Sequence, residues 1–294
     1  PMETLFYRIG NSVYPECFET GSFTIRVIEQ VVANQPNDLE ICDADNDGSA
    51  IFDFTVVEGE LVGTQDPSNL AVSYHDSQGD ADSGIDPLPT NYYSTTSQKT
   101  IYVRVANASD TSCYDTTSFQ ATIFATPVAP NISDWWVCDD DNDGQYQFDL
   151  NEKANEIFDG NGNGAISFYV SEQDAEQAQN TIIDFNTFQN TENPQILYFR
   201  LENNGNANCY NVGQFEVQVF DTPTAYEPMD IVVCDDAETG SYSFDLGQKD
   251  VEVLNGQDGS VYGVTYYASE LDAYNDANAI SKDNYVNSNL TETL

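Results

Sequence analysis

The sequence has very few basic residues. Lysine and arginine total 8 against 50 aspartates and glutamates, which gives the 294-residue chain a formal charge of −42. A polyanion of this density repels nucleic-acid phosphates and anionic lipids, so we expect no nucleic-acid partner. The chain also has no apolar run near the ~20 residues that a membrane-spanning helix needs, so we expect no membrane insertion. The opening residues, PMETLFYRIG, are not typical of a signal peptide, and we expect an internal piece of a longer protein.

The cysteines form two series with one spacing. The leading cysteines are Cys42, Cys138 and Cys234, at a step of 138 − 42 = 96 residues. The second series, which we call the hairpin cysteines, has the same step and consists of Cys17, Cys113 and Cys209. A period this long exceeds that of a solenoid repeat, so each unit is predicted to have its own core. Regularly spaced cysteines in small domains also favour disulfides and an extracellular location.

The phase of the repeat predicts four segments. Residues 1–36 are expected to be the C-terminal part of a truncated repeat, 37–132 and 133–228 two complete repeats, and 229–294 the N-terminal part of another. The short connectors are rich in proline, asparagine and aspartate. Proline limits their freedom, which favours a semi-rigid string of domains.

Short alternating apolar segments bounded by turn residues predict an all-β fold. In the first complete repeat they include NLAVSYH from residue 69, TIYVRV from 100 and SFQATIF from 118. Ser77, with Asp80 three positions later, is expected to cap one helical turn, and the pattern recurs in each repeat. Six or seven strands per unit predict a tandem array of immunoglobulin-like β-sandwich domains with a 96-residue period.

Two disulfide pairings are open. In the first, Cys42 bonds Cys113 and Cys138 bonds Cys209, each within one repeat; in the second, each hairpin cysteine bonds the next leading cysteine, 25 residues on, and all six pair. The expected sandwich favours the first, because the closing strand of about 8 residues carries the chain roughly 27 Å away from the hairpin turn. Reduced, metal-binding cysteines are a further alternative, although no CxxC spacing is present.

An acidic segment follows each leading cysteine. In two of its three copies, aspartates occupy alternate positions before a glycine. The two runs are Asp43, Asp45 and Asp47, then Asp139, Asp141 and Asp143. Calcium loops collect hard oxygen ligands with this spacing, so the sequence predicts structural calcium, with Asp53 and Asp149 as further ligands. The alternative is a chance cluster in a very acidic chain. The third copy, residues 235–240, loses two of the alternating carboxylates, and we expect weak or no calcium binding there.

Three of the few arginines recur at one position of an alternating strand: Arg8, Arg104 and Arg200. A ligand-binding cation is one interpretation. We instead expect a structural guanidinium held by a carboxylate such as Asp53 or Asp149 of the same repeat.

Catalysis has little support in the sequence. His75 is the only histidine, and its repeat counterparts are tyrosines, so we expect a surface strand position and not a catalytic base. Trp135 and Trp136 are expected to pack at a domain junction, with a sugar-stacking platform as the alternative. We expect no enzyme.

The residues CDxDNDGxxxFDL, followed by YVR and by Cys-Tyr, resemble the tandem repeats of large Bacteroidota surface proteins. Those proteins are exported by type IX secretion and are often described as gliding-motility-associated or adhesin-like. The resemblance covers the whole chain and implies an outer-surface location, stalks or filaments, and calcium-stiffened immunoglobulin-like domains.

We therefore expect a non-enzymatic cell-surface adhesin, stalk or filament. Its expected partners are neighbouring repeats of the same chain, other copies in a filament, and a surface glycan or protein target. The alternative is the spacer or carbohydrate-binding region of a secreted polysaccharide-degrading enzyme.

Overall fold

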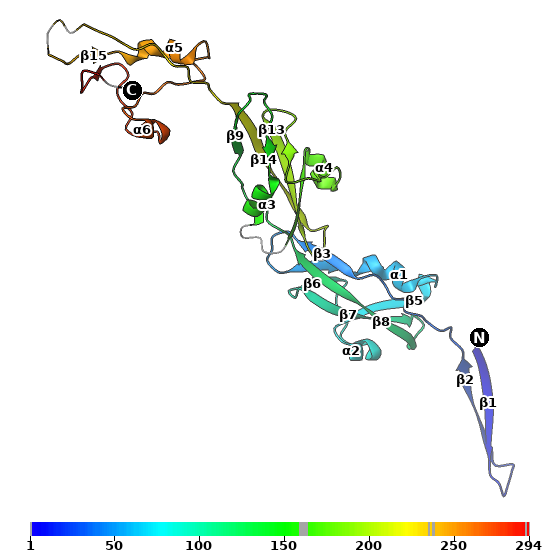
Figure 1. Cartoon of the computed structure of the whole chain (residues 1–294). Helices are drawn as coiled ribbons and strands as arrows, with labels where there is room; N and C mark the ends of the chain where they lie inside the picture. Colours follow the sequence, from blue (N-terminus) through cyan, green and yellow to red (C-terminus); the bar gives the residue numbers. More distant parts are fainter. Residues whose placement is uncertain (1, 159–163, 235, 237–238, 292, 294) are drawn as a thin grey trace. The chain divides into compact units, whose positions relative to one another are not determined.

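The computed structural model of the chain describes all residues except 1, 159–163, 235, 237–238, 292 and 294, and Figure 1 labels its elements. Two compact units can be separated. The first comprises Pro1–Asp134, Phe148–Phe188 and Ile196–Glu216, and the second Trp135–Gln147, Gln189–Gln195 and Val217–Leu294. We call residues 2–26 the N-terminal hairpin, residues 39–125 the first repeat, residues 135–221 the second repeat and residues 230–294 the partial third repeat.

The first repeat is a sandwich of a four-stranded and a two-stranded sheet. The large sheet has the order β3-β8-β7-β5, and the small sheet pairs β4 with β6. Only the β3–β8 pair of these strands is parallel. The strands are β3 (Leu39–Asp43), β4 (Ala50–Asp53), β5 (Leu70–His75), β6 (Asn91–Ser94), β7 (Gln98–Asn107) and β8 (Asp110–Ala125). The helices are η1 (Phe54–Val57), α1 (Glu58–Val62), η2 (Pro67–Asn69) and α2 (Gln78–Ser83).

The core of the first repeat lies between its two sheets. Alternate residues of the β7–β8 hairpin are buried: Ile101, Val103, Val105, Phe119, Ala121 and Ile123. Phe54 packs against them, with its ring centroid 5.6 Å from that of Phe119 and 4.9 Å from that of Tyr74. The Tyr74 hydroxyl donates to the Phe54 carbonyl at 2.8 Å. The hairpin therefore supplies one side of the core, and the first half of the repeat supplies the other.

Serine caps begin the short helices as the sequence predicts. Ser77 caps α2, and its hydroxyl accepts from the Asp80 amide; Ser171 and Ser269 do the same for α4 and α6. The apolar residues 50–57 would suit a strand, but strand β4 ends at Asp53 and the chain continues as helix. Asp53 causes this change, because its carboxylate accepts from the Thr55 amide and starts η1.

The second repeat has the same sheet plan. Its large sheet has the order β11-β13-β14-β9, and β10 pairs with β12. Its elements are β9 (Trp135–Asp139), β10 (Gln147–Phe148), α3 (Leu150–Phe158), β11 (Gly164–Tyr169), α4 (Glu172–Gln177), β12 (Phe188–Gln189), β13 (Gln195–Asn203) and β14 (Tyr210–Asp221). β9 pairs in parallel with the end of β14, as β3 does with β8.

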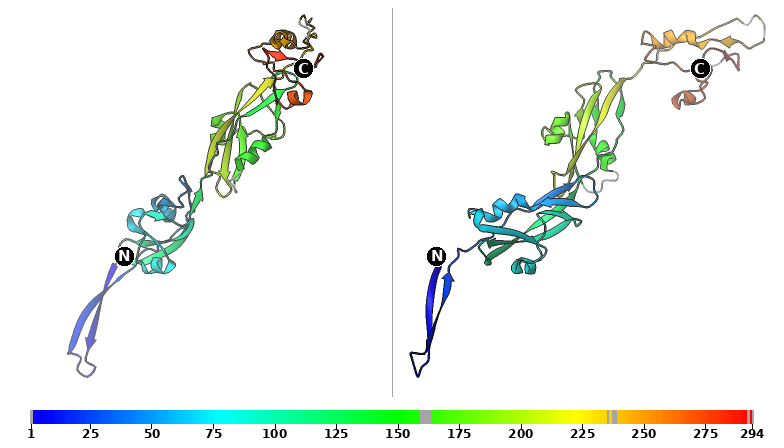
Figure 2. Two further views of the ribbon diagram at one scale, coloured as in Figure 1. Left: turned by 90° about the vertical axis from the view of Figure 1, so that its left-hand side faces the viewer. Right: turned by 180° about the vertical axis from the view of Figure 1, so that it is seen from behind.

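The N-terminal hairpin consists of β1 (Met2–Gly10) and β2 (Phe18–Arg26), which form a two-stranded sheet of their own. Figure 2 shows these strands, in dark blue, with no other strand beside them. The partial third repeat has β15 (Ser243–Phe244), η3 (Leu246–Lys249), α5 (Asp250–Leu254), α6 (Glu270–Tyr274) and β16 (Tyr285–Val286). The fold is thus a tandem array of mainly β, immunoglobulin-like repeats with short helices, and the predicted fold class is confirmed.

No helix among the described residues is both long enough and apolar enough to cross a membrane.

Candidate functional site

The site is built around the end of the first repeat where β3 and β8 finish side by side. Their parallel register sets Cys42 beside Phe124 and Asp43 beside Ala125, the last residue of β8. The acidic loop follows β3 directly, and the linker follows β8. We call this the exit end of the repeat. It carries a cysteine and a cluster of carboxylates within a few residues.

The structure bonds Cys42 to Cys209, across 167 residues of sequence. The two Cα atoms lie 5.3 Å apart, within the usual disulfide range. Cys42 belongs to the first repeat, whereas Cys209 precedes β14 in the second and is almost fully buried. The disulfide therefore joins two successive repeats.

The turn between β13 and β14 contacts the exit end beside this bond. The Asn203 side chain donates to the Ala125 carbonyl at 2.9 Å, and the Asn206 side chain donates to Glu40 at 2.7 Å. A Cβ added to Gly205 would come within 2.7 Å of the Phe124 ring, so the turn needs glycine for this close approach. The disulfide is supported by a packed, hydrogen-bonded contact.

The predicted pairings of Cys42 with Cys113 and of Cys138 with Cys209 are wrong. Because β3 runs parallel to β8, Cys42 lies beside Phe124, which is 124 − 113 = 11 residues along β8 from Cys113. At about 3.3 Å per residue the two ends of this stretch are roughly 36 Å apart, too far for a disulfide. The 25-residue alternative does not occur either, because Cys113 and Cys138 are both free thiols.

The second repeat repeats the arrangement of the first. β9 sets Cys138 beside Phe220 near the end of β14, so this leading cysteine also lies at an exit end. Four cysteines are free among the described residues: Cys17, Cys138 and Cys234 are exposed, and Cys113 is half-buried. In the one disulfide of the described residues, the leading cysteine Cys42 thus bonds the hairpin cysteine of the repeat that follows it.

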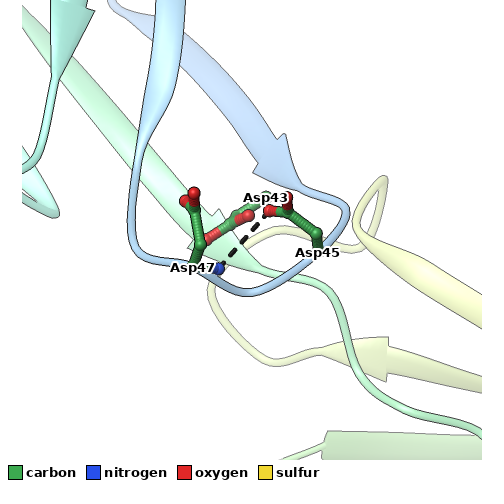
Figure 3. A group of neighbouring side chains, drawn as sticks. All are labelled: Asp43, Asp45 and Asp47. Atoms are coloured by element: carbon green, nitrogen blue, oxygen red, sulfur yellow. Dashed lines mark hydrogen bonds between the residues drawn. The ribbon is translucent and has the colours of Figure 1, made fainter.

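The acidic loops bring together the six aspartates that the sequence predicts as alternating ligands. Carboxylate oxygens of Asp43, Asp45 and Asp47 all lie within 4.8 Å of one another, and those of the second-repeat triad do the same. Figure 3 shows the three side chains of the first loop converging, with the Asp47 amide donating to Asp45. Asn46 and Gly48 adopt positive φ values of 55° and 82°, which fold the loop back on itself.

Backbone amides stabilise the ionised form of the first aspartate of each loop. The Gly48 amide donates to Asp43 at 2.7 Å, and the Gly144 amide donates to Asp139 at 2.6 Å. Burial opposes ionisation of both groups, but these hydrogen bonds and those of neighbouring residues hold the pKa of each below its usual value. The pKa of Asp141 is raised, because it shares a hydrogen bond with Asp139 and is repelled by Asp143.

These loops fit a hard cation in charge and in donor type, since calcium takes six to eight oxygen ligands. One threonine hydroxyl beside each exit end, that of Thr126 and that of Thr222, is buried with no hydrogen-bond partner among the described residues. The Thr126 amide donates to the Asp43 carbonyl, so this residue touches the loop.

Two predicted ligands lie outside the clusters. Asp53 accepts hydrogen bonds from Thr55, and Asp149 accepts them from Asn151, each at the start of a helix. In the third acidic segment, residues 235–240, positions 235, 237 and 238 lie outside the described residues.

The recurring arginines have a structural role, and a carboxylate of the same repeat holds one of them, since Arg200 donates to Glu202 at 2.5 Å; the named candidates Asp53 and Asp149 are not partners of either arginine. Arg104 donates to the carbonyls of Ala81 and Asp82 at the end of α2, at 2.9 and 2.8 Å, and to the Thr111 carbonyl in the hairpin turn. Its guanidinium lies 3.5 Å from the centre of the Tyr114 ring. Arg200 makes the equivalent contacts with α4, with its own hairpin turn and with the Tyr210 ring. The tyrosine of each Cys-Tyr pair is therefore a platform for this arginine.

The expected surface position of His75 is wrong. Its side chain is fully buried and is hydrogen-bonded to Ser73 and to the Ile85 carbonyl. Trp136 is 63% exposed and packs edge-to-face against Phe220 of the neighbouring strand β14.

These features define a class of protein: an array of mainly β repeats in which a disulfide joins one repeat to the next. The chain belongs to the Flavobacterium inter-domain disulphide bond domain family, whose model matches residues 38–127, 134–223 and 230–294. The Cys42–Cys209 bond joins the first two matched segments. The description of that family is of a domain with an inter-domain disulfide.

Three solved structures illustrate what the chain is similar to. The human Desmocollin-1 ectodomain is 13% identical, with 92% of this chain and 57% of that chain covered and a TM-score of 0.18. The zebrafish RET cadherin-like domains 1 to 4 are 12% identical, with 87% and 76% covered and a TM-score of 0.19. Tandem Ig repeats of Dlar are 10% identical, with 65% and 97% covered and a TM-score of 0.20. Among curated proteins, none matches this chain.

Proposed function

We propose that the chain is a non-enzymatic stalk region of an extracellular adhesin. Its repeats are covalently linked in series, so that the stalk stays stiff and holds a binding end away from the cell. The observation that carries the proposal is the Cys42–Cys209 bond together with the hydrogen bonds that Asn203 and Asn206 make to the preceding repeat. A disulfide between repeats limits their relative motion, whereas a disulfide within a repeat would only stabilise its fold.

Small-angle scattering of the oxidised chain and of its Cys42→Ser variant tests this stiffness. We expect the variant to show a broader distribution of pairwise distances, because loss of the bond frees the two repeats to bend at the linker. Cys113→Ser is the matched control, because that thiol is free. Identical scattering from oxidised wild type and Cys42→Ser would count against a stiff stalk.

We further propose that the two acidic loops bind calcium and stiffen the exit ends. Three clustered carboxylates repel one another without a cation, as the raised pKa of Asp141 illustrates, and a bound cation removes this repulsion. Saturation at 100 times the dissociation constant would add about 2.7 kcal/mol of stability per site.

Calorimetric titration with calcium and with magnesium tests these sites. Asp141→Asn should abolish binding at the second loop, while Asp140→Asn removes the same charge from a side chain outside the cluster and should leave binding almost unchanged. A melting temperature that is insensitive to both calcium and chelator would reject the proposal.

The proposed setting is the outer surface of a Bacteroidota cell, reached by type IX secretion, where the strongly acidic surface would keep the stalk solvated. The alternative is the carbohydrate-binding region of a secreted polysaccharide-degrading enzyme. The exposed Trp136, which packs against Phe220, favours this alternative because an exposed indole ring can stack on a sugar. Binding to a panel of immobilised glycans that disappears in Trp136→Ala would support it, and no binding would remove its basis.

A further inference from the structure

A groove lies between helix α4 and strand β14 of the second repeat. Its volume is about 350 Å³, at the small end of the range for small-molecule sites. The Tyr198 and Tyr210 side chains line it from the large sheet, and Glu172 and Glu176 line it from the helix. Two elements thus bring aromatic rings and carboxylates to one concave surface.

A buried arginine fixes the helix and one of the rings relative to the sheet. Arg200, on β13, donates to the carbonyls of Ala175 and Glu176 in α4, at 3.2 and 2.9 Å. Its guanidinium also lies 3.3 Å from the centre of the Tyr210 ring. The same side chain therefore holds both sides of the groove, so the groove is formed before any ligand arrives.

The first repeat has a side-chain bridge at the equivalent place. The Gln78 amide in α2 donates to the Asp82 carboxylate at 2.7 Å and to the Thr116 hydroxyl at 3.0 Å. Thr116 belongs to β8, so this one side chain crosses from the helix to the strand. In the first repeat the space between the two elements is therefore occupied by the protein itself.

The second repeat cannot form this bridge, because its residues differ in chemistry. Glu172 and Val212 occupy the positions of the bridging glutamine and of the threonine. A carboxylate only accepts hydrogen bonds, and valine has no polar side-chain atom. Glu176 takes the position of the aspartate, one helical turn from Glu172. Among the described residues, no side chain donates to either carboxylate, so both can accept from a ligand.

These groups suit a sugar better than a cation. Sugar hydroxyls donate strong, charge-assisted hydrogen bonds to carboxylates, and the apolar face of a pyranose ring packs on an aromatic ring. A cationic ligand would meet the charge of Arg200, which already lies over the Tyr210 ring. An acidic sugar would be repelled by the two glutamates.

We propose that this groove binds a neutral pyranose unit of a glycan. The sugar packs on the Tyr198 ring, and its hydroxyls donate to Glu172 and Glu176. The repeat then recognises a ligand by itself, in addition to any mechanical role of the array. This binding depends neither on the stiffness of the stalk nor on the exposed Trp136.

Calorimetric titration of the full chain tests the proposal, with a chelator present so that the acidic loops hold no cation. The ligands are cellohexaose, laminarihexaose and mannohexaose, with hexagalacturonate as the acidic counterpart. We expect at least one neutral hexasaccharide to bind with a dissociation constant of about 1 mM or lower, and hexagalacturonate not to bind.

Two variants of the groove show where the sugar binds. Glu172→Gln combined with Val212→Thr introduces the residues of the first-repeat bridge, and should weaken binding at least about tenfold. Tyr198→Ala should weaken it similarly, because the packing surface is lost. Its matched control is Tyr102→Ala, which changes the counterpart in the first repeat and should leave binding unchanged. Circular dichroism checks that each variant folds.

Several outcomes would overturn the proposal. They are no binding of any of the three neutral hexasaccharides, binding that survives both groove variants, and binding that only Trp136→Ala removes. Binding of spermidine but not of sugar, if the groove variants remove it, would show a cation site instead. None of these outcomes affects the scattering of Cys42→Ser, so the stiffness of the stalk is tested separately.

Discussion

Removal of the Cys42–Cys209 bond should strongly destabilise the pair of repeats that it joins. The bond closes a loop of 167 residues in the unfolded chain. In the chain-entropy model, closing a loop of that length raises the free energy of the unfolded state by about 5 kcal/mol at 25 °C. Removal of the bond loses this stabilisation of the folded state. Cys42→Ser and Cys209→Ser should therefore each lower the free energy of unfolding by up to that amount, and the double variant by no more than either single variant, because both remove the same cross-link.

Guanidinium denaturation of the oxidised, dilute chain measures this effect. Cys113→Ser is the matched control and should change stability by less than about 0.5 kcal/mol, because its thiol is free and only half-buried. If the disulfide lay within the repeat, Cys113→Ser would destabilise the first repeat as much as Cys42→Ser. Equal loss of stability in these two variants, or a mapped Cys42–Cys113 peptide, would refute the reasoning.

Three further predictions concern single repeats. Arg104→Lys should cost roughly 1–3 kcal/mol in chemical denaturation, because lysine cannot reach all three carbonyls or stack on Tyr114, whereas the exposed Arg26→Lys should cost almost nothing. Leu61→Ala should cost roughly 2–5 kcal/mol, because Leu61 is fully buried, while Val56→Ala at a 63% exposed position should lie within about 0.5 kcal/mol of wild type. Burial would raise the pKa of Glu156, but hydrogen bonds from Lys153 and Ser133 outweigh it and lower the pKa below 4.5. The ionised Glu156 carboxylate therefore stabilises the folded state above pH 4.5, and this stabilisation is lost as the pH falls through the lower pKa of the folded state. The free energies of unfolding of wild type and Glu156→Gln should therefore converge in acid. A difference between them that does not depend on pH would contradict this prediction.

The mainly β tandem fold can be read from the sequence because its signals are local. Alternation marks the β7 and β8 strands, and the Ser77–Asp80 spacing marks the start of α2, each from a few adjacent residues. The helix after β4 gives a weaker signal. Its apolar residues suit a strand equally well, and only the cap made by Asp53 to the Thr55 amide decides the outcome.

The residues of the site can also be predicted, but several of their partners cannot. Asp43, Asp45 and Asp47 are close in sequence, so a single loop brings them together. The partners of Arg104 are backbone carbonyls at the end of α2 and in the hairpin turn, and a carbonyl has no residue type to recognise. The burial of His75 likewise depends on the Ile85 carbonyl and not on any pattern around the histidine.

The disulfide shows why regular spacing does not determine connectivity. The 96-residue step is the same whether each leading cysteine bonds the hairpin cysteine of its own repeat, of the next repeat or of a more distant one. When each leading cysteine bonds a cysteine of the next repeat, some cysteines near both ends of a finite array stay unpaired. Choosing the pairing that uses all six cysteines therefore favours the 25-residue alternative, which is wrong. Strand direction decides the matter. Parallel pairing of β3 with the end of β8 puts Cys42 at the exit end, beyond the reach of Cys113 and within reach of the following repeat. The same parallel strand delivers Asp43 and its loop to that end, so the covalent link and the proposed cation site follow from one feature of the topology.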